Sequence, residues 1–188
     1  MEQRIIHIEW QGPFHWKEIK SLSAPSDRGI YQVYGCHPLY GADVLLYIGK
    51  TDNQTFARRL KQESFWQWHQ DFGRLSLYVG RLAGSGTPRE SEWSKQIDLA
   101  ERLLIVSHEP AVNAQKSIQR DSPELQSVHV FNWGSYRSLM PEVSGYRWSA
   151  YYDKMPSYDV FGKHRARKTA IPSNKSLQST ARRREVQI

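Results

Sequence analysis

The sequence contains a single cysteine, Cys36, and no long apolar run. One cysteine excludes an intrachain disulfide framework and a cysteine-rich zinc site, and it indicates a reducing compartment. No apolar stretch approaches the roughly 20 residues that a membrane-spanning helix requires, and the polar N-terminus lacks the apolar core of a signal peptide. We therefore expect a cytoplasmic (intracellular) protein without a membrane partner.

A general excess of positive charge is also lacking. The chain of 188 residues has a net charge of +7, but residues 1–160 contain equal numbers of basic and acidic residues. The excess lies in residues 161–188, which either bind polyanions or form a solvated end. From Gly162 onward the chain is rich in Ser, Lys and Arg without periodicity, which predicts a disordered tail. The rest has the apolar and aromatic content of a folded domain.

Two short apolar segments are the centre of our interpretation. Gly29–Gly35 reads GIYQVYG and Val44–Gly49 reads VLLYIG, with turn residues between them, so the pair predicts a β-hairpin with a long loop. Alternation places Leu45 and Tyr47 on one face of the second strand. Tyr31 of the first strand shares a surface with Tyr47 if the strand register allows it.

Two helices are predicted after the hairpin. Thr55 is a candidate N-cap for a helix from Phe56 to about His69. The segment Thr87–Glu90 is a capping box with proline at the first helical position, and it predicts a helix from Pro88 to about Ser107. A third strand is expected over residues 74–79, and an edge strand over residues 126–133.

A carboxylate interrupts the apolar stripe of the second helix. The stripe has helical spacing and consists of Trp93, Ile97, Glu101 and Leu104. Burying a charged carboxylate is costly unless another charge compensates it. We therefore expect a cation or an arginine near Glu101.

The order of these motifs resembles the GIY-YIG nuclease family. Both naming triplets are present, and the later motifs match an arginine-bearing helix, a metal-binding glutamate and a final asparagine. The matching segments are Gly29-Ile30-Tyr31, Tyr47-Ile48-Gly49, Phe56–Leu60, Glu101–Ile105 and Asn113 after Pro110. The resemblance covers roughly residues 28–115. It implies an α/β fold with a small, mainly antiparallel three-stranded sheet flanked by helices, followed by a C-terminal extension. The expected divisions are a lead-in (1–27), a nuclease core (28–115), an aromatic-rich extension (116–161) and a basic tail (162–188).

The same resemblance implies metal-dependent hydrolysis of DNA phosphodiester bonds. Glu101 is expected to bind Mg²⁺ or Mn²⁺, because hard cations take oxygen ligands. Arg59 is expected to contact the scissile phosphate and stabilise its charge. Arg58 is the rival for that role, but the family arginine usually directly precedes an apolar residue, here Leu60. Glu63 stands where some family members have a histidine, which puts a histidine-based proton transfer in doubt.

For each remaining candidate residue, the resemblance implies a functional role, and a purely structural role is the alternative. Tyr31 resembles the proposed general base, although a phenol with a pKa near 10 is a poor base at neutral pH, and Tyr47 resembles the residue that positions water or phosphate. Both tyrosines are otherwise core residues. Lys50 either lowers a tyrosine pKa or contacts phosphate. Gly49 either allows close approach of DNA or ends the strand, and Asn113 either fixes the site or is a turn residue.

Two other functions stay open at this point. A nucleic-acid-binding module without catalytic activity would retain the phosphate contacts. A protein-interaction domain would use the aromatic extension (116–161), whose rings either contact a partner or DNA or form a second small core. The sequence leaves the DNA target and the formation of a homodimer undecided.

Overall fold

The computed structural model describes residues 3–63, 75–84, 88–113 and 122–147. The chain divides into two units, Met1–Tyr152 and Asp153–Ile188, and the second unit lies outside the described residues. The predicted basic tail, the helix beyond Glu63 and residues 116–121 and 148–161 of the aromatic extension also lie outside them. In the part of the chain that is described, no helix is long and apolar enough to cross a bilayer.

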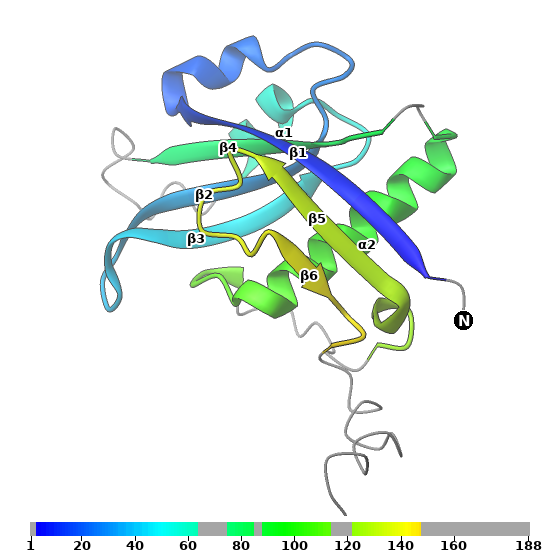
Figure 1. Cartoon of the computed structure of the whole chain (residues 1–188). Helices are drawn as coiled ribbons and strands as arrows, with labels where there is room; N and C mark the ends of the chain where they lie inside the picture. The colour runs from blue at the N-terminus through cyan, green and yellow to red at the C-terminus, as the bar shows by residue number, and fades with distance from the viewer. Residues whose placement is uncertain (1–2, 64–74, 85–87, 114–121, 148–188) are drawn as a thin grey trace, which may run out of the picture. The chain divides into compact units, whose positions relative to one another are not determined.

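A six-stranded mixed sheet forms the centre of the first unit (Figure 1). The strands in order across the sheet are β3 (Gly41–Thr51), β2 (Gly29–His37), β4 (Ser76–Leu82), β1 (Arg4–His15), β5 (Val128–Gly134) and β6 (Glu142–Ser144). β1 and β5 run parallel, all other neighbours are antiparallel, and the sheet curls into a half-barrel. The predicted three-stranded sheet flanked by helices is therefore wrong. Strands β2, β3 and β4 are only half of the observed sheet.

The other half comes from segments outside the motif-bearing region. β1 passes through Gly12-Pro13 and continues to His15, with a register shift between Gln11 and Phe14. Such an irregularity accommodates a proline, which has no N–H for the ladder. β5 was expected at an edge and instead lies between β1 and β6. Alternation predicts that a strand exists, but it does not identify partners that lie more than a hundred residues apart, such as Ile6 and Val130.

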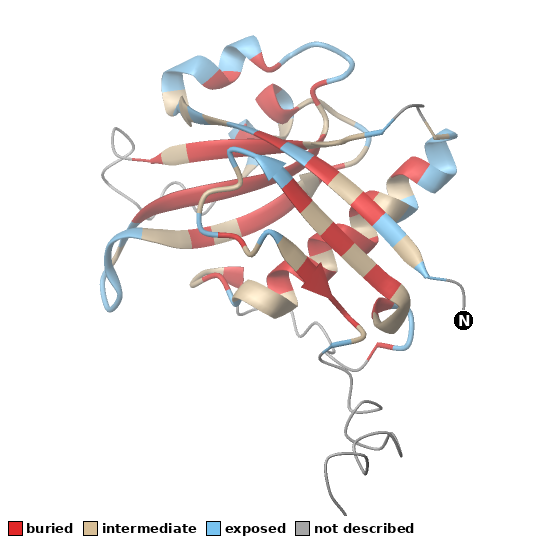
Figure 2. Ribbon diagram, in the orientation of Figure 1, coloured by how far each residue is buried: buried red, intermediate tan, exposed pale blue. Residues whose placement is uncertain are grey.

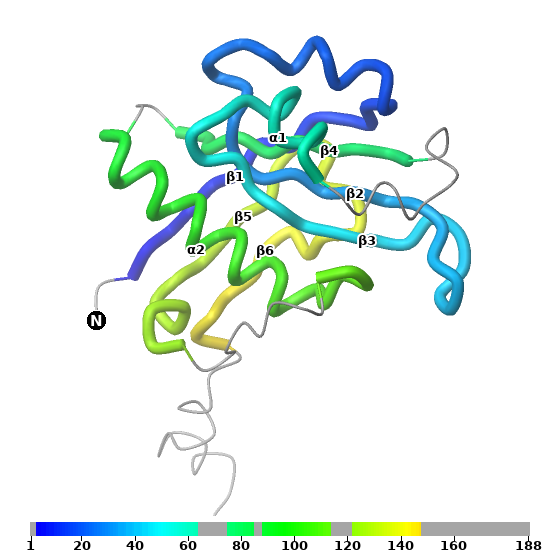
Figure 3. The backbone as a smooth tube through the Cα atoms, turned by 180° about the vertical axis from the view of Figure 1, so that it is seen from behind, coloured from blue at the N-terminus to red at the C-terminus, as the bar shows by residue number. Residues whose placement is uncertain are grey.

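Helices cover both faces of the sheet. The long helix α2 (Glu90–His108) lies across one face, as Figure 3 shows, and the short helix η5 (Leu125–Ser127) precedes β5. The 3-10 helix η1 (Trp16–Ser21) and the helix α1 (Phe56–Gln62) pack on the other face. Strands β2 and β4 are largely buried between these layers, whereas β1 and β5 alternate buried residues with intermediate or exposed ones (Figure 2). Between α2 and the sheet, the core includes Ile97 and Leu104 of α2 packed with Ile6, Ile8, Trp10 and Ile30. On the other face, Ile19 of η1 and Phe56 and Leu60 of α1 pack with Val33 and Leu77.

The hairpin of β2 and β3 contains a bulge that decides which side chains face α1. Val33 pairs with Tyr47 and Tyr34 pairs with Leu45, so Leu46 is an extra residue in β3. As a result Leu46 and Tyr47 both pack on the α1 face, whereas Leu45 packs on the α2 face. The prediction that Leu45 and Tyr47 share a face is wrong. The prediction that the two tyrosines share a surface is confirmed, because Tyr31 also packs on the α1 face.

Candidate functional site

A polar cavity of about 410 Å³ lies where β3, α1 and α2 meet. Its wall consists of Lys50, Asp52, Asn53, Gln54, Arg58, Arg59 and Glu101. Lys50 comes from the end of β3, both arginines come from α1, and Glu101 comes from α2. Four of the residues selected from the sequence therefore line one cavity, although Glu101 lies more than forty residues after the other three in the chain.

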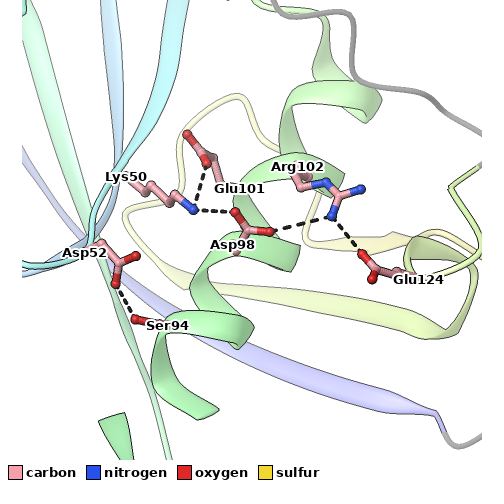
Figure 4. Close-up of polar contacts among 7 residues, drawn as sticks. All are labelled: Lys50, Asp52, Ser94, Asp98, Glu101, Arg102 and Glu124. Atoms are coloured by element: carbon pink, nitrogen blue, oxygen red, sulfur yellow. Dashed lines mark hydrogen bonds and ion pairs between the residues drawn. The ribbon is translucent and has the colours of Figure 1, made fainter. Parts of the chain in front are cut away.

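Glu101 is buried within the apolar stripe of α2, and its residue exposure is only 5%. The Nζ atom of Lys50 is 3.7 Å from Oε2 of Glu101 and also pairs with Asp98, one turn earlier on α2 (Figure 4). The other carboxylate oxygen of Asp98 is 3.6 Å from Nη1 of Arg102. The predicted cation beside Glu101 is thus confirmed as Lys50. It compensates a carboxylate whose burial would otherwise be costly.

The carboxylates at the cavity are too few to bind a metal ion by themselves, but they can bind a hard cation together with other oxygen ligands. Among the described residues, no group of three or more His, Cys, Asp or Glu side chains is placed to hold a metal ion. The buried carboxylate of Glu101 is part of the cavity wall. The carboxylate of Asp98 pairs with the same lysine, Lys50. Mg²⁺ commonly binds through one or two carboxylates together with waters and substrate phosphate oxygens. These residues therefore fit a Mg²⁺ or Mn²⁺ site that is completed by a phosphate.

The two adjacent arginines of α1 differ in their surroundings. Arg58 is exposed, whereas the side chain of Arg59 is 33% exposed and its Nη2 atom lies 2.6 Å from Oε1 of Glu63. The same carboxylate oxygen accepts a hydrogen bond from the hydroxyl of Tyr31 at 2.6 Å. Arg59 therefore has one side at the cavity and another at the Tyr31–Glu63 pair. This placement favours Arg59 over Arg58 as the arginine with a fixed orientation.

The two tyrosines lie behind the cavity wall. Tyr31 is completely buried, and its ring centroid is 6.0 Å from that of Tyr47. Burial, reinforced by the negative charge of Glu63, raises the pKa of Tyr31 well above its usual value. Burial and the charges of Glu63 and Glu101 raise the pKa of Tyr47 to about 12. Both phenols therefore keep their protons at neutral pH, which makes them hydrogen-bond donors and unsuitable as bases.

Gly49 makes room for the tyrosine pair. A Cβ atom at this position would lie 2.5 Å from Oη of Tyr31 and 2.6 Å from Cε1 of Tyr47, which is too close for either ring to stay in place. Gly49 is also buried, so its lack of a side chain serves ring packing in this structure. The space beside Gly49 is filled by the two tyrosine rings, so these contacts do not support the close approach of DNA that the sequence suggested.

Asn113 holds the strand that carries the second triplet. The backbone N–H of Ile48 donates to Oδ1 of Asn113 at 2.8 Å, and Nδ2 of Asn113 donates to the carbonyl of Ile48 at 2.9 Å. The backbone N–H groups of Ala111 and Val112 donate to the carbonyls of Leu45 and Leu46. Residues 111–113 thus pair along the free edge of β3. Asn113 is a positioning residue that fixes the backbone between Tyr47 and Gly49.

Sequence reasoning did not assign Glu63 or Asp98 to the site. The four-residue spacing of Arg59 and Glu63 is visible in the sequence and predicts their ion pair. The contact between Glu63 and Tyr31 depends on how α1 packs on the sheet, which local spacing does not reveal. Asp98 lies one turn before Glu101, and only its pairing with Lys50 distinguishes it from an ordinary exposed helix carboxylate.

Comparison of the chain with protein-family models, with curated proteins and with solved structures finds no significant match. The case for a function therefore rests on the motifs and on the geometry of the cavity.

Proposed function

We propose that the protein is a metal-dependent endonuclease that hydrolyses DNA phosphodiester bonds. The main supporting observation is that Lys50, Arg59 and Glu101, from three separate elements, line one polar cavity. Phosphodiester hydrolysis requires neutralisation of the charge that grows on the phosphate, and a hard cation on a carboxylate assists it. The order of the two triplets and the later motifs, which resembles the GIY-YIG family, supports the same reaction and DNA as the substrate.

Each residue at the cavity wall has a role in this proposal. Arg59 donates its planar N–H groups to the scissile phosphate, and Arg58 and Lys50 contact phosphates of the DNA backbone. Glu101 is the residue that would hold Mg²⁺ or Mn²⁺. The bound cation supplies charge neutralisation and lowers the pKa of a water molecule.

The residues behind the wall position those that touch the substrate. Tyr47 is half-buried and protonated, so it acts as a hydrogen-bond donor that orients water or phosphate. Tyr31 acts from the buried side, and Gly49 and Asn113 hold the tyrosines and β3 in place. Because Cys36 is the only cysteine, we place this activity in the reducing cytoplasm.

The two arginines provide the first test. Wild type, Arg59→Ala and Arg58→Ala are incubated with plasmid, branched and single-stranded DNA, in Mg²⁺, in Mn²⁺ or with a chelator. Wild type is expected to cleave only with metal. Arg59→Ala is expected to lose about 10²-fold or more in cleavage rate, as the loss of an electrostatic catalytic group usually does. Arg58→Ala, which removes an exposed neighbour, is expected to lose less than about tenfold.

Other results would redirect the proposal. Salt-sensitive DNA binding without cleavage under any metal condition would make the protein a binding module. Tight, salt-insensitive binding to a protein partner without cleavage would point to an interaction domain. A larger loss in Arg58→Ala than in Arg59→Ala would exchange the roles of the two arginines.

A further inference from the structure

One carboxylate oxygen links the most deeply buried tyrosine of the site to its catalytic arginine. Oε1 of Glu63 lies 2.6 Å from the hydroxyl of Tyr31 and 2.6 Å from Nη2 of Arg59. The side chain of Glu63 is only 13% exposed, so the shared carboxylate is largely shielded from water, whereas the side chain of Arg59 is 33% exposed at the cavity. Charge-assisted hydrogen bonds of this length are stronger than neutral ones, and shielding preserves their strength.

The position of Tyr31 excludes direct contact with DNA in this arrangement. Its exposure is zero, it is packed edge-on against Phe56 of α1, and Gly49 lies against its hydroxyl. The wall of the cavity is formed by other residues, among them Arg59. The hydroxyl of Tyr31 donates its hydrogen bond to Glu63. Any influence of Tyr31 on a substrate in the cavity must therefore pass through the side chains that it contacts, which are Glu63, Arg59 and Tyr47.

We propose that Glu63 is a positioning residue that fixes the Arg59 guanidinium at the cavity wall, and that Tyr31 acts on the reaction through Glu63. This inference rests on the proposed nuclease function for its catalytic consequence, but the contact itself is a property of the folded chain. The fold anchors Tyr31 on β2, Tyr31 anchors Glu63 at the end of α1, and Glu63 anchors Arg59. A planar guanidinium held at one nitrogen keeps its other N–H groups directed at the cavity.

We call the contacts from Tyr31 to Glu63 and from Glu63 to Arg59 the brace, and they predict a specific ranking of variants. Glu63→Ala removes the shared acceptor and is expected to lower the single-turnover cleavage rate about tenfold or more, with a smaller change in the DNA concentration for half-maximal rate. Glu63→Gln keeps an oxygen that accepts both hydrogen bonds, and it is expected to restore the rate to within about fivefold of wild type. Tyr31→Phe removes the anchor of Glu63 and is expected to give an intermediate loss.

A double-mutant cycle separates an action through Glu63 from an independent one. If Tyr31 acts through Glu63, the double variant Tyr31→Phe/Glu63→Ala cleaves as fast as Glu63→Ala alone. Glu90→Gln is the matched control, because Glu90 also pairs with an arginine, Arg28, but is exposed and is not a residue of the cavity wall. This control is expected to cleave at the wild-type rate.

The test is completed by a measurement that does not depend on cleavage. NMR of the Arg59 guanidinium reports how fast the group rotates about its Nε–Cζ bond. Slow rotation is expected in wild type and Glu63→Gln, and faster rotation in Glu63→Ala. Equal rotation in wild type and Glu63→Ala would overturn the brace, and so would multiplying losses in the double variant or a Glu63→Ala rate within about twofold of wild type. If wild type cleaves no DNA but the rotation changes as expected, the nuclease proposal fails and the brace stands.

Discussion

Tyr47 illustrates how the surroundings of one residue set its chemistry in this protein. Its phenol is half-buried on the α1 face of β3, and burial, reinforced by the negative charges of Glu63 and Glu101, raises its pKa. Ionisation would place a third negative charge beside two existing ones. The residue therefore contributes a stable hydrogen-bond donor at neutral pH, and its charge state becomes relevant only in strongly alkaline solution.

This shift predicts an alkaline loss of stability. A phenol in the unfolded chain ionises near pH 10, whereas Tyr47 in the folded protein ionises at about 12. The contribution of Tyr47 to the free energy of unfolding is fully present below about pH 10 and is lost as the pH rises through about 12. It is lost because Tyr47 ionises at a lower pH in the unfolded chain than in the folded protein. Urea unfolding at pH 8 and pH 11 should show a smaller pH dependence in Tyr47→Phe than in wild type. Tyr40→Phe, at an exposed position, should behave as wild type. An identical pH dependence in Tyr47→Phe and wild type would contradict the assigned shift.

At the scale of elements, the free edge of β3 is held by the segment that follows α2. Residues 111–113 donate three backbone or side-chain hydrogen bonds to β3, and Asn113 also accepts one from Ile48. An edge strand with unpaired backbone groups is a weak point of a sheet. Here the edge is paired where it carries Tyr47 and Gly49, so this part of β3 is fixed on both sides.

Asn113 variants test this pairing. Asn113→Ala is expected to lower the free energy of unfolding by about 1–3 kcal/mol, because it leaves buried backbone groups of Ile48 unsatisfied. Asn113→Asp should be at least as destabilising, since a carboxylate cannot donate to the Ile48 carbonyl. Urea unfolding at neutral pH measures both effects, with Asn53→Ala at an exposed position as the control. Wild-type stability in Asn113→Asp would show that the pairing does not hold β3.

Several elements could be predicted from local sequence, and others could not. The β2–β3 hairpin and α2 were predictable because apolar alternation and helical spacing are local signals. The bulge at Leu46 was not, because one extra residue in a strand leaves no mark in the composition of the segment. The prediction for α2 began two residues early, at Pro88. In the structure Arg89 is the N-cap, without a side-chain cap bond, and the predicted cap Thr87 lies outside the described residues.

At the scale of the whole first unit, the site was more predictable than the sheet. The cavity residues lie on β3, α1, α2 and the loop between β3 and α1, all within the region that carries the motifs. The sheet also requires β1, β5 and β6, whose pairings join segments far apart in sequence. The order of the motifs therefore indicates which residues line the cavity, but it does not indicate which strands pair in the sheet. This explains why the expected residues meet although the expected three-stranded sheet is wrong.

The most direct test of the central claim concerns Glu101, the buried carboxylate that the cavity shares with Arg59. The measurement is the single-turnover cleavage rate of one labelled DNA duplex in Mg²⁺ for wild type, Glu101→Gln and Glu92→Gln. Glu92 lies on the same helix but is exposed and outside the cavity wall. We predict that Glu101→Gln loses about 10²-fold or more in rate, whereas Glu92→Gln cleaves as wild type. Full activity in Glu101→Gln, or equal losses in the two variants, would contradict the claim that these residues act together on one phosphate.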